Sequence, residues 1–130
     1  MTTLLLDSHV AHWWSAEPDR LSANASRTLA DADELAVASI TWFELAWLAA
    51  RGRIVVTLPV RSWLEGLSAE VRTVGTTPAV ASTAVSLPAS FPGDPADRLI
   101  YATAIEHGWQ LVTKDRRLRR HRSPRQIAIW

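Results

Sequence analysis

The chain has 130 residues, of which 48% are hydrophobic and 21% are charged, and this balance is typical of one globular domain with a substantial core. It contains no cysteine, which excludes disulfides, thiol catalysis and cysteine-ligated zinc and favours a reducing compartment. No apolar run approaches the roughly 20 residues that a membrane span needs. Since no basic segment precedes the apolar N-terminal residues, we expect a cytoplasmic protein without a membrane segment.

Short apolar runs alternate along the chain with segments of helical character. In chain order we predict a strand at 3–6, helices at 8–14 and 22–32, a strand at 35–38, helices at 39–51 and 59–67, a strand at 71–74, helices at 77–88 and 94–108, and strands at 109–112 and 127–129. This alternation predicts an α/β domain over residues 1–130, with a parallel sheet covered by helices on both faces.

The predicted helix boundaries rest on capping residues, prolines and glycines. The expected caps are Ser22, Ser39 or Thr41, Thr77 and Asp94. Pro78 and Pro95 occupy the first helical position after two of these caps, where proline loses no hydrogen bond. Gly52 and Gly108 stand where glycine commonly ends a helix.

Four acidic residues follow the predicted strands. Asp7 directly follows the first strand, and Asp115 comes shortly after the strand at 109–112. Glu44 lies on the helix after the second strand, and Asp97 lies in the first turn of the helix that begins after the loop 88–95. Because parallel sheets bind ligands at the carboxyl ends of their strands, we expect these acids to converge on one edge.

Clustered carboxylates repel one another unless a cation compensates their charge. Oxygen ligands without cysteine suit Mg²⁺ or Mn²⁺, and such an ion can activate water and stabilise an in-line displacement at phosphorus. The pattern therefore predicts metal-dependent hydrolysis of phosphodiesters.

Each acid also has an ordinary structural interpretation, as a helix cap or as a solvated side chain. A negative charge at Asp97, in the first turn of its helix, would interact favourably with the helix dipole whether or not the side chain binds a metal. Glu44 is the strongest single candidate, because its neighbours Trp42, Phe43 and Leu45 are apolar and predict a largely buried helix. Glutamate is rarely buried without a partner. The prediction rests on the four acids together.

Four segments resemble, in order, spacing and context, the acidic motifs of PIN-domain nucleases, and most closely those of VapC toxins from type II toxin–antitoxin pairs. They are LLLDSH at 4–9, ASITWFEL at 38–45, DPADRLIYATA at 94–104 and LVTKD at 111–115. The resemblance implies a PIN-like parallel sheet between helices and a homodimer. It also implies an Mg²⁺- or Mn²⁺-dependent endoribonuclease, often acting on tRNA or ribosomal RNA, that a cognate antitoxin holds inactive.

Carried over by position, the resemblance makes Asp7, Glu44, Asp97 and Asp115 the acidic site. We interpret Asp7 and Asp97 as the principal metal ligands. Glu44 and Asp115 would bind a second ion, act through bound water or orient the attacking water. The family often has Asp-Thr at the first motif, where this chain has Asp7 and Ser8, so a hydroxyl is kept.

Several residues beside these acids have two interpretations. Ser8, Ser39 and Thr113 either support the acids by hydrogen bonds or are ordinary cap and turn residues. Asp94, which precedes Pro95, is interpreted as the cap of the helix from which Asp97 reaches a metal. His9 and His12 are interpreted as cap-proximal or surface residues.

Residues 114–125 hold seven of the fourteen basic residues and one acid. This basic run is either a solvated surface or a binding site for phosphates. The second interpretation assigns RNA contacts to five residues: Lys114, Arg116, Arg117, Arg119 and Arg120. Of the seven tryptophans, those on predicted helices are interpreted as packing or protein-interface residues, with stacking on RNA bases as the alternative.

Two rival functions are considered. A receiver domain of phosphotransfer signalling has a similar length, but it needs an acidic pair after the first strand and an acceptor aspartate after the middle strand. Here one acid follows the first strand, and Gly75 follows the strand at 71–74. The other rival is a PIN-like module that binds RNA or protein without cleavage.

Overall fold

A parallel sheet runs through the middle of the computed structural model, which describes residues 1–122 and 125–130. Within this part of the chain the sheet has five strands: β1 (Thr3–Leu6), β2 (Glu34–Ala38), β3 (Arg72–Val74), β4 (Gln110–Val112) and β5 (Ala128–Ile129). Their order is β3-β2-β1-β4-β5, and every neighbouring pair is parallel. The predicted α/β class and parallel sheet are confirmed.

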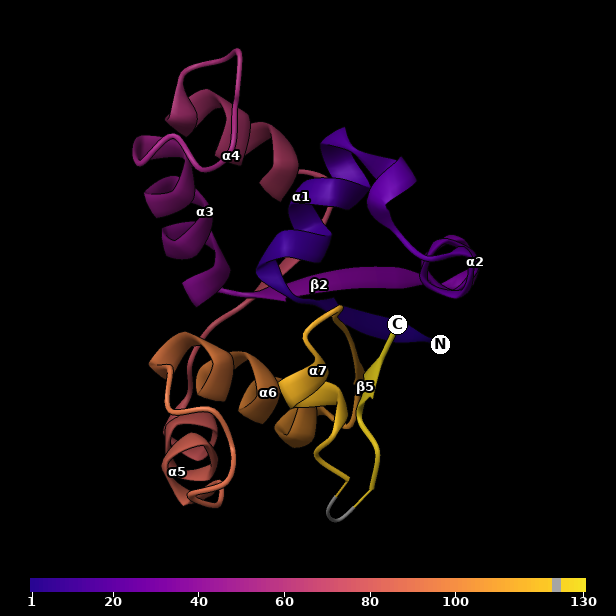
Figure 1. The fold of residues 1–130 in the computed structure, drawn as a ribbon, viewed down its shortest axis with the longest axis vertical. Coiled ribbons are helices and arrows are strands. Elements are labelled where there is room, and N and C mark those ends of the chain that lie inside the picture. The colour runs from indigo at the N-terminus through magenta and orange to yellow at the C-terminus, as the bar shows by residue number, and fades with distance from the viewer. Residues whose placement is uncertain (123–124) are drawn as a thin grey trace.

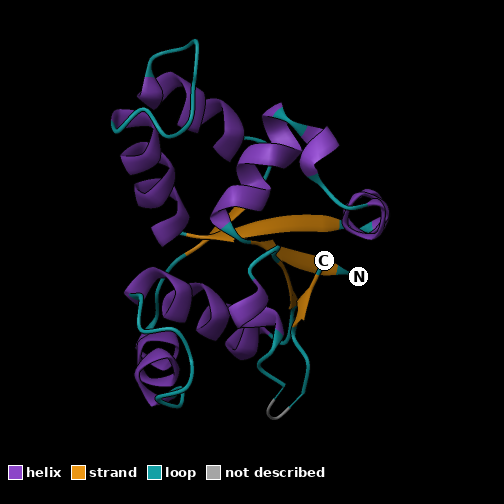
Figure 2. Ribbon diagram, viewed as in Figure 1, coloured by secondary structure: helices purple, strands orange, loops and turns teal. Residues whose placement is uncertain are grey.

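Helices cover both faces of this sheet. They are α1 (Ser8–Ala16), α2 (Ala23–Asp31), α3 (Ile40–Ala50), α4 (Val60–Ser68), α5 (Pro78–Ser86), α6 (Pro95–His107) and α7 (Arg116–Arg119), with a 3₁₀ turn, η1, at Pro18–Arg20. Figure 1 places α1 to α4 above the sheet and α5 to α7 below it, and Figure 2 shows the strands between the two helical layers. None of the helices in the described ranges has the length and apolar character to cross a bilayer.

The central strand β1 explains the two-sided core, because its side chains alternate between the faces of the sheet. Leu5 packs in a cluster with Ile100 of α6, while Leu4 and Leu6 pack in a second cluster with Val10 of α1. The three leucines are between 0 and 2% exposed. Burying each one contributes about 1.5–3 kcal/mol, which fixes the strand whose end carries Asp7.

The capping pattern is confirmed at three helices and wrong at one. The side chains of Ser22, Thr77 and Asp94 each accept a backbone N–H in the first turn of the following helix. Ser39 instead has a helical backbone, with φ −57° and ψ −29°, and makes no capping bond, while Thr41 is buried inside the helix. The connection from β2 into α3 is so tight that Ser39 already belongs to the helical turn, which leaves no extended residue to act as a cap.

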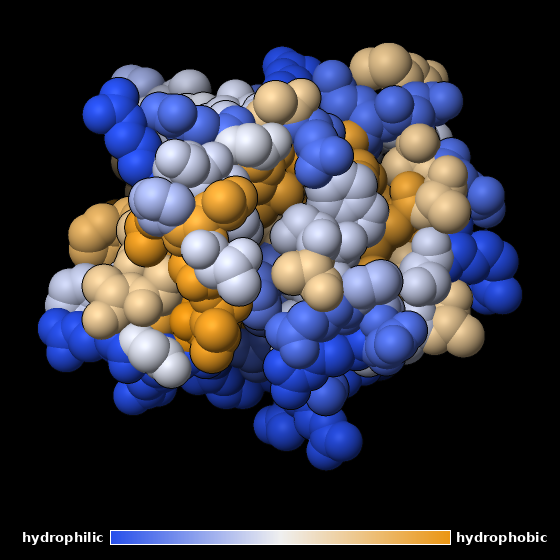
Figure 3. All heavy atoms as spheres, turned by 90° about the horizontal axis from the view of Figure 1, so that it is seen from above, coloured by the Kyte–Doolittle hydropathy of each residue, from blue (hydrophilic) through white to orange (hydrophobic). Residues whose placement is uncertain are grey.

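The expectation that α3 is largely buried is also wrong. Leu45 is fully buried, but Phe43 is 62% exposed and Trp47 is 49% exposed. Apart from Thr41 and Glu44 this helix is apolar, and one side packs on α1, α4 and α6 while the other faces outward. Figure 3 shows apolar atoms gathered on the side of the molecule that carries α3 and α4. Exposed apolar patches of this kind are typical of surfaces that contact other molecules.

Arg98 of α6 holds the loop that leads into its own helix. Its guanidinium donates hydrogen bonds of 2.9–3.3 Å to five backbone carbonyls, those of Ala84, Leu87, Pro88, Phe91 and Pro92. These carbonyls belong to the end of α5 and to the loop after it, where regular helical hydrogen bonding ends. The planar fork of arginine is suited to satisfying several acceptors at once. Arg98 therefore fixes the position of Asp94 and of the start of α6.

We predict that Arg98→Lys lowers the free energy of unfolding by about 2 kcal/mol or more, because lysine keeps the charge but cannot reach five carbonyls. Urea denaturation measures this. Arg61→Lys is the matched control, since Arg61 is exposed and among the described residues bonds only to Glu65, and its effect should stay within about 0.5 kcal/mol. Equal stability of the two variants would contradict the structural role of Arg98.

Candidate functional site

Asp7 lies at the carboxyl end of β1 and is 5% exposed. One carboxylate oxygen accepts the backbone N–H of Ser8 at 2.8 Å, so Asp7 caps α1. The other oxygen accepts the hydroxyl of Thr113 at 2.6 Å, and Thr113 follows β4, the strand next to β1. Two neighbouring strand ends thus fix this buried carboxylate through charge-assisted hydrogen bonds. Each oxygen keeps a further lone pair for another ligand.

Glu44 reaches the same place from the second turn of α3. Its carboxylate accepts the hydroxyl of Ser8 at 2.5 Å, and the Ser8 oxygen lies 3.3 Å from the hydroxyl of Thr41. Burial raises the pKa of Glu44, as do the charges of Asp7 and Asp94, while the bond from Ser8 opposes this increase. Ser8 therefore links the residue after β1 to the acid on α3.

Asp97 is partly buried at the start of α6, with its side chain 16% exposed. Burial raises the pKa of Asp97 to about 7, with further contributions from Asp7, Asp94 and Asp115. Arg117, whose Nη2 lies 3.4 Å from the Asp97 carboxylate, acts in the opposite direction. Since three other carboxylates affect Asp97, the structure brings these acids into one negatively charged region.

Asp115 caps the short helix α7 and is paired with arginine. Its carboxylate accepts the backbone N–H of Arg117 at 2.9 Å and bonds to the guanidinium of Arg117 at 2.7 and 3.1 Å. These bonds lower the pKa of Asp115. Its own N–H donates to the hydroxyl of Thr113 at 3.0 Å, so Thr113 connects Asp7 and Asp115.

Asp94 is the cap that its sequence context predicted. Its carboxylate accepts the N–H groups of Ala96 at 2.8 Å and of Asp97 at 3.3 Å. Asp94 is exposed, whereas Asp97, one turn into the helix, lies among the other acids. Asp7 and Asp115 are caps as well, so the ordinary structural interpretation of these two acids holds alongside a chemical one.

The supporting residues and histidines differ in part from the sequence interpretation. Ser8 and Thr113 bond to the acids, but within residues 1–122 and 125–130 the side chain of Ser39 makes no hydrogen bond. His12 is buried rather than at the surface, at 5% exposure. His9 accepts the N–H of Lys114 at 3.0 Å, and its Nδ1 lies 3.6 Å from the carboxylate of Asp7.

His9 is a site residue that the sequence interpretation missed. Burial lowers its pKa, which keeps the imidazole largely neutral near pH 7. Its place beside Lys114 depends on the pairing of β1 with β4, and no local motif marks that contact. Its position directly after the Asp7-Ser8 cap is the one signal that pointed to it.

The basic run divides into different environments. Arg117 bonds to Asp97 and Asp115, and the Lys114 ammonium lies 5.7 Å from the ring centre of Trp13. Arg116, Arg119 and Arg120 line a groove that has no acidic residue among its lining residues. Ser123 and Pro124, which belong to the same run, lie outside the described residues.

The carboxylates fit a divalent cation by their donor chemistry and by their uncompensated charge. In the part of the chain that the structure describes, however, no three Asp, Glu or His side chains converge closely enough to hold a metal ion. The guanidinium of Arg117 contacts both Asp97 and Asp115. An arginine thus neutralises part of the charge that a cation would neutralise.

A pocket of about 380 Å³ opens beside these acids, between α3 and the start of α6. Glu44 and Asp94 line it together with apolar side chains that include Phe43 and Trp47. The acidic region is therefore accessible from the surface next to an apolar wall.

Comparisons with known proteins give one family and a consistent fold. The family model described as the PIN domain matches residues 4–123. The chain is 72% identical over all 130 residues to ribonuclease VapC22 of Mycobacterium tuberculosis (strain ATCC 25618 / H37Rv), with both chains fully covered.

Among solved structures, the chain is similar to one in VapBC2 from Rickettsia felis bound to a DNA fragment from their promoter, with TM-score 0.72, 17% identity and 98% of each chain covered. It is also similar to one in a toxin–antitoxin complex from Klebsiella pneumoniae, with TM-score 0.63, 21% identity and 86% of each chain covered. At such identities these likenesses concern the fold.

We predict that Arg117→Ala increases the response of the protein to divalent cations. Without metal, the free energy of unfolding of the variant should fall by up to about 1 kcal/mol, because the substitution removes an exposed arginine that pairs with two carboxylates. Mg²⁺ should then raise the melting temperature of the variant more than that of the wild type, since more repulsion remains to be relieved. Thermal unfolding with and without Mg²⁺ measures this. An equal or smaller Mg²⁺ effect in Arg117→Ala than in Arg116→Ala would contradict the expected competition.

Proposed function

Because the chain belongs to the PIN-domain family, as a member of the VapC type, we propose that it is a metal-dependent endoribonuclease. In this proposal it hydrolyses RNA phosphodiester bonds and acts as the toxin of a toxin–antitoxin pair. The observation that carries the proposal is the grouping of Asp7, Glu44, Asp97 and Asp115 at the carboxyl edge of the sheet, in a chain 72% identical to a ribonuclease.

The proposed cofactor is Mg²⁺ or Mn²⁺, held chiefly by Asp7 and Asp97. Glu44 and Asp115 would hold a second ion or act through bound water. When bound, such an ion supplies an activated water and stabilises the charge that develops on the phosphoryl oxygens. Mg²⁺ is commonly bound by one or two carboxylates together with waters and substrate phosphate, which agrees with a cluster that is not a closed cage of protein ligands.

The protein's own residues orient these groups. The Ser8 N–H and the Thr113 hydroxyl hold the two oxygens of Asp7 in place, so the carboxylate presents its free lone pairs in fixed directions. The Ser8 hydroxyl does the same for one oxygen of Glu44. Asp94 and Arg98 fix the first turn of α6 and hence the position of Asp97.

Arg117 has two successive partners in this proposal. Without metal it neutralises Asp97 and Asp115. If these acids held a cation, the Arg117 guanidinium would be free to bond to a phosphate of the RNA at the edge of the acidic site, because arginine matches phosphate with two parallel N–H donors. Lys114, next in the chain to Asp115, adds positive charge beside the site.

The substrate and the partners complete the proposal. The substrate is a structured RNA, either tRNA or ribosomal RNA. A cognate antitoxin inhibits the enzyme, and the protein forms a homodimer. Support for the antitoxin comes from a solved structure of similar fold, the toxin–antitoxin complex from Klebsiella pneumoniae.

We predict that Asp7→Asn and Asp97→Asn each reduce RNA cleavage by at least about 100-fold, because loss of a partner of a metal ligand alone typically costs 10–100-fold. Asp94→Asn should keep most of the activity, since asparagine also caps helices. The measurement is cleavage of total RNA with Mg²⁺ or Mn²⁺, followed by mapping of the cut sites on tRNA and ribosomal RNA.

Asp94→Asn is the matched control for Asp97→Asn, because the same chemical change is made three residues away in the same helix start. Full cleavage in EDTA would contradict the metal requirement. If the wild type binds RNA but cuts none under any of these conditions, the rival function of a non-cleaving RNA-binding module is correct. Equal loss of cleavage in Asp94→Asn, with the fold intact, would show that the roles of the two aspartates are divided wrongly.

A further inference from the structure

A groove of about 490 Å³ lies between α7, the start of α2 and the C-terminal strand, and we call it the arginine groove. The residues that line it are Asn24, Arg116, Arg119, Arg120, Arg122, Gln126, Ala128, Ile129 and Trp130. Four of these nine are arginines, and none is acidic. The groove therefore concentrates positive charge in a hollow rather than on a flat surface.

The positive charge of this groove is not matched by acids. Arg20, Arg61, Arg72 and Arg117 each form an ion pair with a carboxylate. Within the described ranges the groove's four arginines form none. The Nε of Arg119 is buried without a hydrogen-bond partner among these residues, although its Nη2 donates to the carbonyl of Lys114 at 3.2 Å. Buried donors usually have partners, so this N–H is a donor that the described residues leave unsatisfied.

The groove is adjacent to the acidic site through helix α7. Asp115 is the cap of this helix, and Arg116 is its first residue. Arg120 lines the groove and also a second hollow of about 300 Å³ that contains Arg117 and His121. Because Arg117 bonds to Asp97 and Asp115, a path of arginines connects the groove to the carboxylates.

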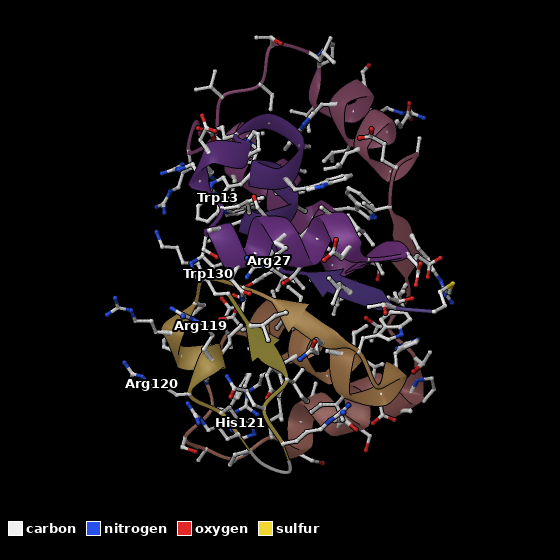
Figure 4. The ribbon with its side chains drawn as sticks, turned by 90° about the vertical axis from the view of Figure 1, so that its right-hand side faces the viewer. Trp13, Arg27, Arg119, Arg120, His121 and Trp130 are labelled. Carbon is white, nitrogen blue, oxygen red and sulfur yellow. The ribbon has the colours of Figure 1, made fainter. Side chains whose placement is uncertain are left out.

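Figure 4 shows the face of the molecule that carries the arginine groove. Arg119 and Arg120 project from α7, and Trp130 lies between them and Trp13, in agreement with a ring distance of 6.0 Å between the two tryptophans. Arg27 of α2 lies on the same face and bonds to Asn24, which is part of the groove. Asn24 also donates to the carbonyl of Trp130 at 3.0 Å, which fixes the C-terminal wall of the groove.

We propose that the arginine groove holds the sugar–phosphate backbone of the RNA substrate beside the scissile bond, an inference that rests on the proposed function. Four arginines without acidic partners fit a chain of phosphates better than a single anion, because successive phosphates each accept a bidentate guanidinium. Trp130 forms an apolar wall against which the sugars or bases of the strand rest. Arg120 and Arg117 carry the strand from the groove to the acids.

Such a groove supplies affinity but does not read sequence. Contacts with phosphate fix the position and direction of a nucleic acid, whereas sequence is recognised through the bases. Loss of the groove should therefore weaken the binding of different RNAs by a similar factor and leave the choice of cut site unchanged. It should also reduce the dependence of binding on salt, because fewer counterions are released.

The test uses RNA binding by the full chain carrying Asp97→Asn, so that bound RNA stays intact. Arg116→Ala and Arg120→Ala are added together, since both side chains are exposed and their loss leaves the core unchanged. Fluorescence anisotropy with labelled RNA oligonucleotides of two unrelated sequences measures Kd between low and moderate salt. We expect Kd to rise at least about tenfold for both sequences, and the salt slope to fall by about 1.4, or about 0.7 for each lost contact.

Arg53→Ala with Arg61→Ala in the same background is the matched control, because it removes the same charge around α4 and should leave both values unchanged. An unchanged Kd and slope in the groove variant would overturn the proposal, as would an equal loss in the control, which would reveal only a general charge effect. In the protein that keeps Asp97 and can cleave RNA, Arg116→Ala with Arg120→Ala should also raise KM for cleavage more than it lowers kcat. If the wild type cuts RNA while the groove variant binds RNA normally, the role proposed for the groove is wrong and the proposed function stands. If the wild type neither binds nor cuts RNA, both fail.

Discussion

The buried carboxylate of Asp7 is the interaction on which the rest of this structure depends. It lies at the end of the central strand, 5% exposed, and hydrogen bonds from Ser8 and Thr113 hold its two oxygens. A carboxylate at this depth costs several kcal/mol unless it is hydrogen-bonded or paired. The ends of β1 and β4 supply these bonds, and the two strands are parallel neighbours in the sheet. The parallel pairing therefore places both hydrogen-bond donors beside the Asp7 carboxylate.

The other acids are brought to Asp7 by different supports. Glu44 is linked through the Ser8 hydroxyl, Asp115 through Thr113, and Asp97 through the helix start that Asp94 and Arg98 fix. Burial first, and then the negative charges of Asp7, Asp94 and Asp115, raise the pKa of Asp97 to about 7. Arg117 offsets this charge only in part. The fold is thus arranged to hold an excess of negative charge at one edge of the sheet, which a bound cation would compensate in the proposed reaction.

Much of the fold was predictable because its signals are local. The apolar strands, the caps Ser22, Thr77 and Asp94, and the parallel sheet follow from residue type and spacing, and the structure confirms them. The four-residue helix α7 was not predicted, since it is too short and too charged to show an apolar period. The outward face of α3 was missed because a helix with apolar residues on every side does not indicate which of its sides is covered.

The site was predictable only as a set of acids at strand ends. The supports from Ser8 and Thr113 were among the alternatives, whereas Ser39 was assigned a role that its tight helical turn does not allow. The role of His9 depends on a contact with Lys114, far away in the chain. The role of Arg98 depends on loop carbonyls that its side chain binds. No local sequence pattern marks either kind of contact.

The central claim is that these carboxylates form one cation site, and a crystal structure of the wild-type protein grown with Mn²⁺ tests it most directly. We expect an anomalous scattering peak from Mn²⁺ within bonding distance of oxygens of Asp7 and Asp97, with the Arg117 guanidinium moved away from Asp97. Mn²⁺ bound elsewhere, or no peak at these carboxylates with Arg117 still paired to both aspartates, would contradict it.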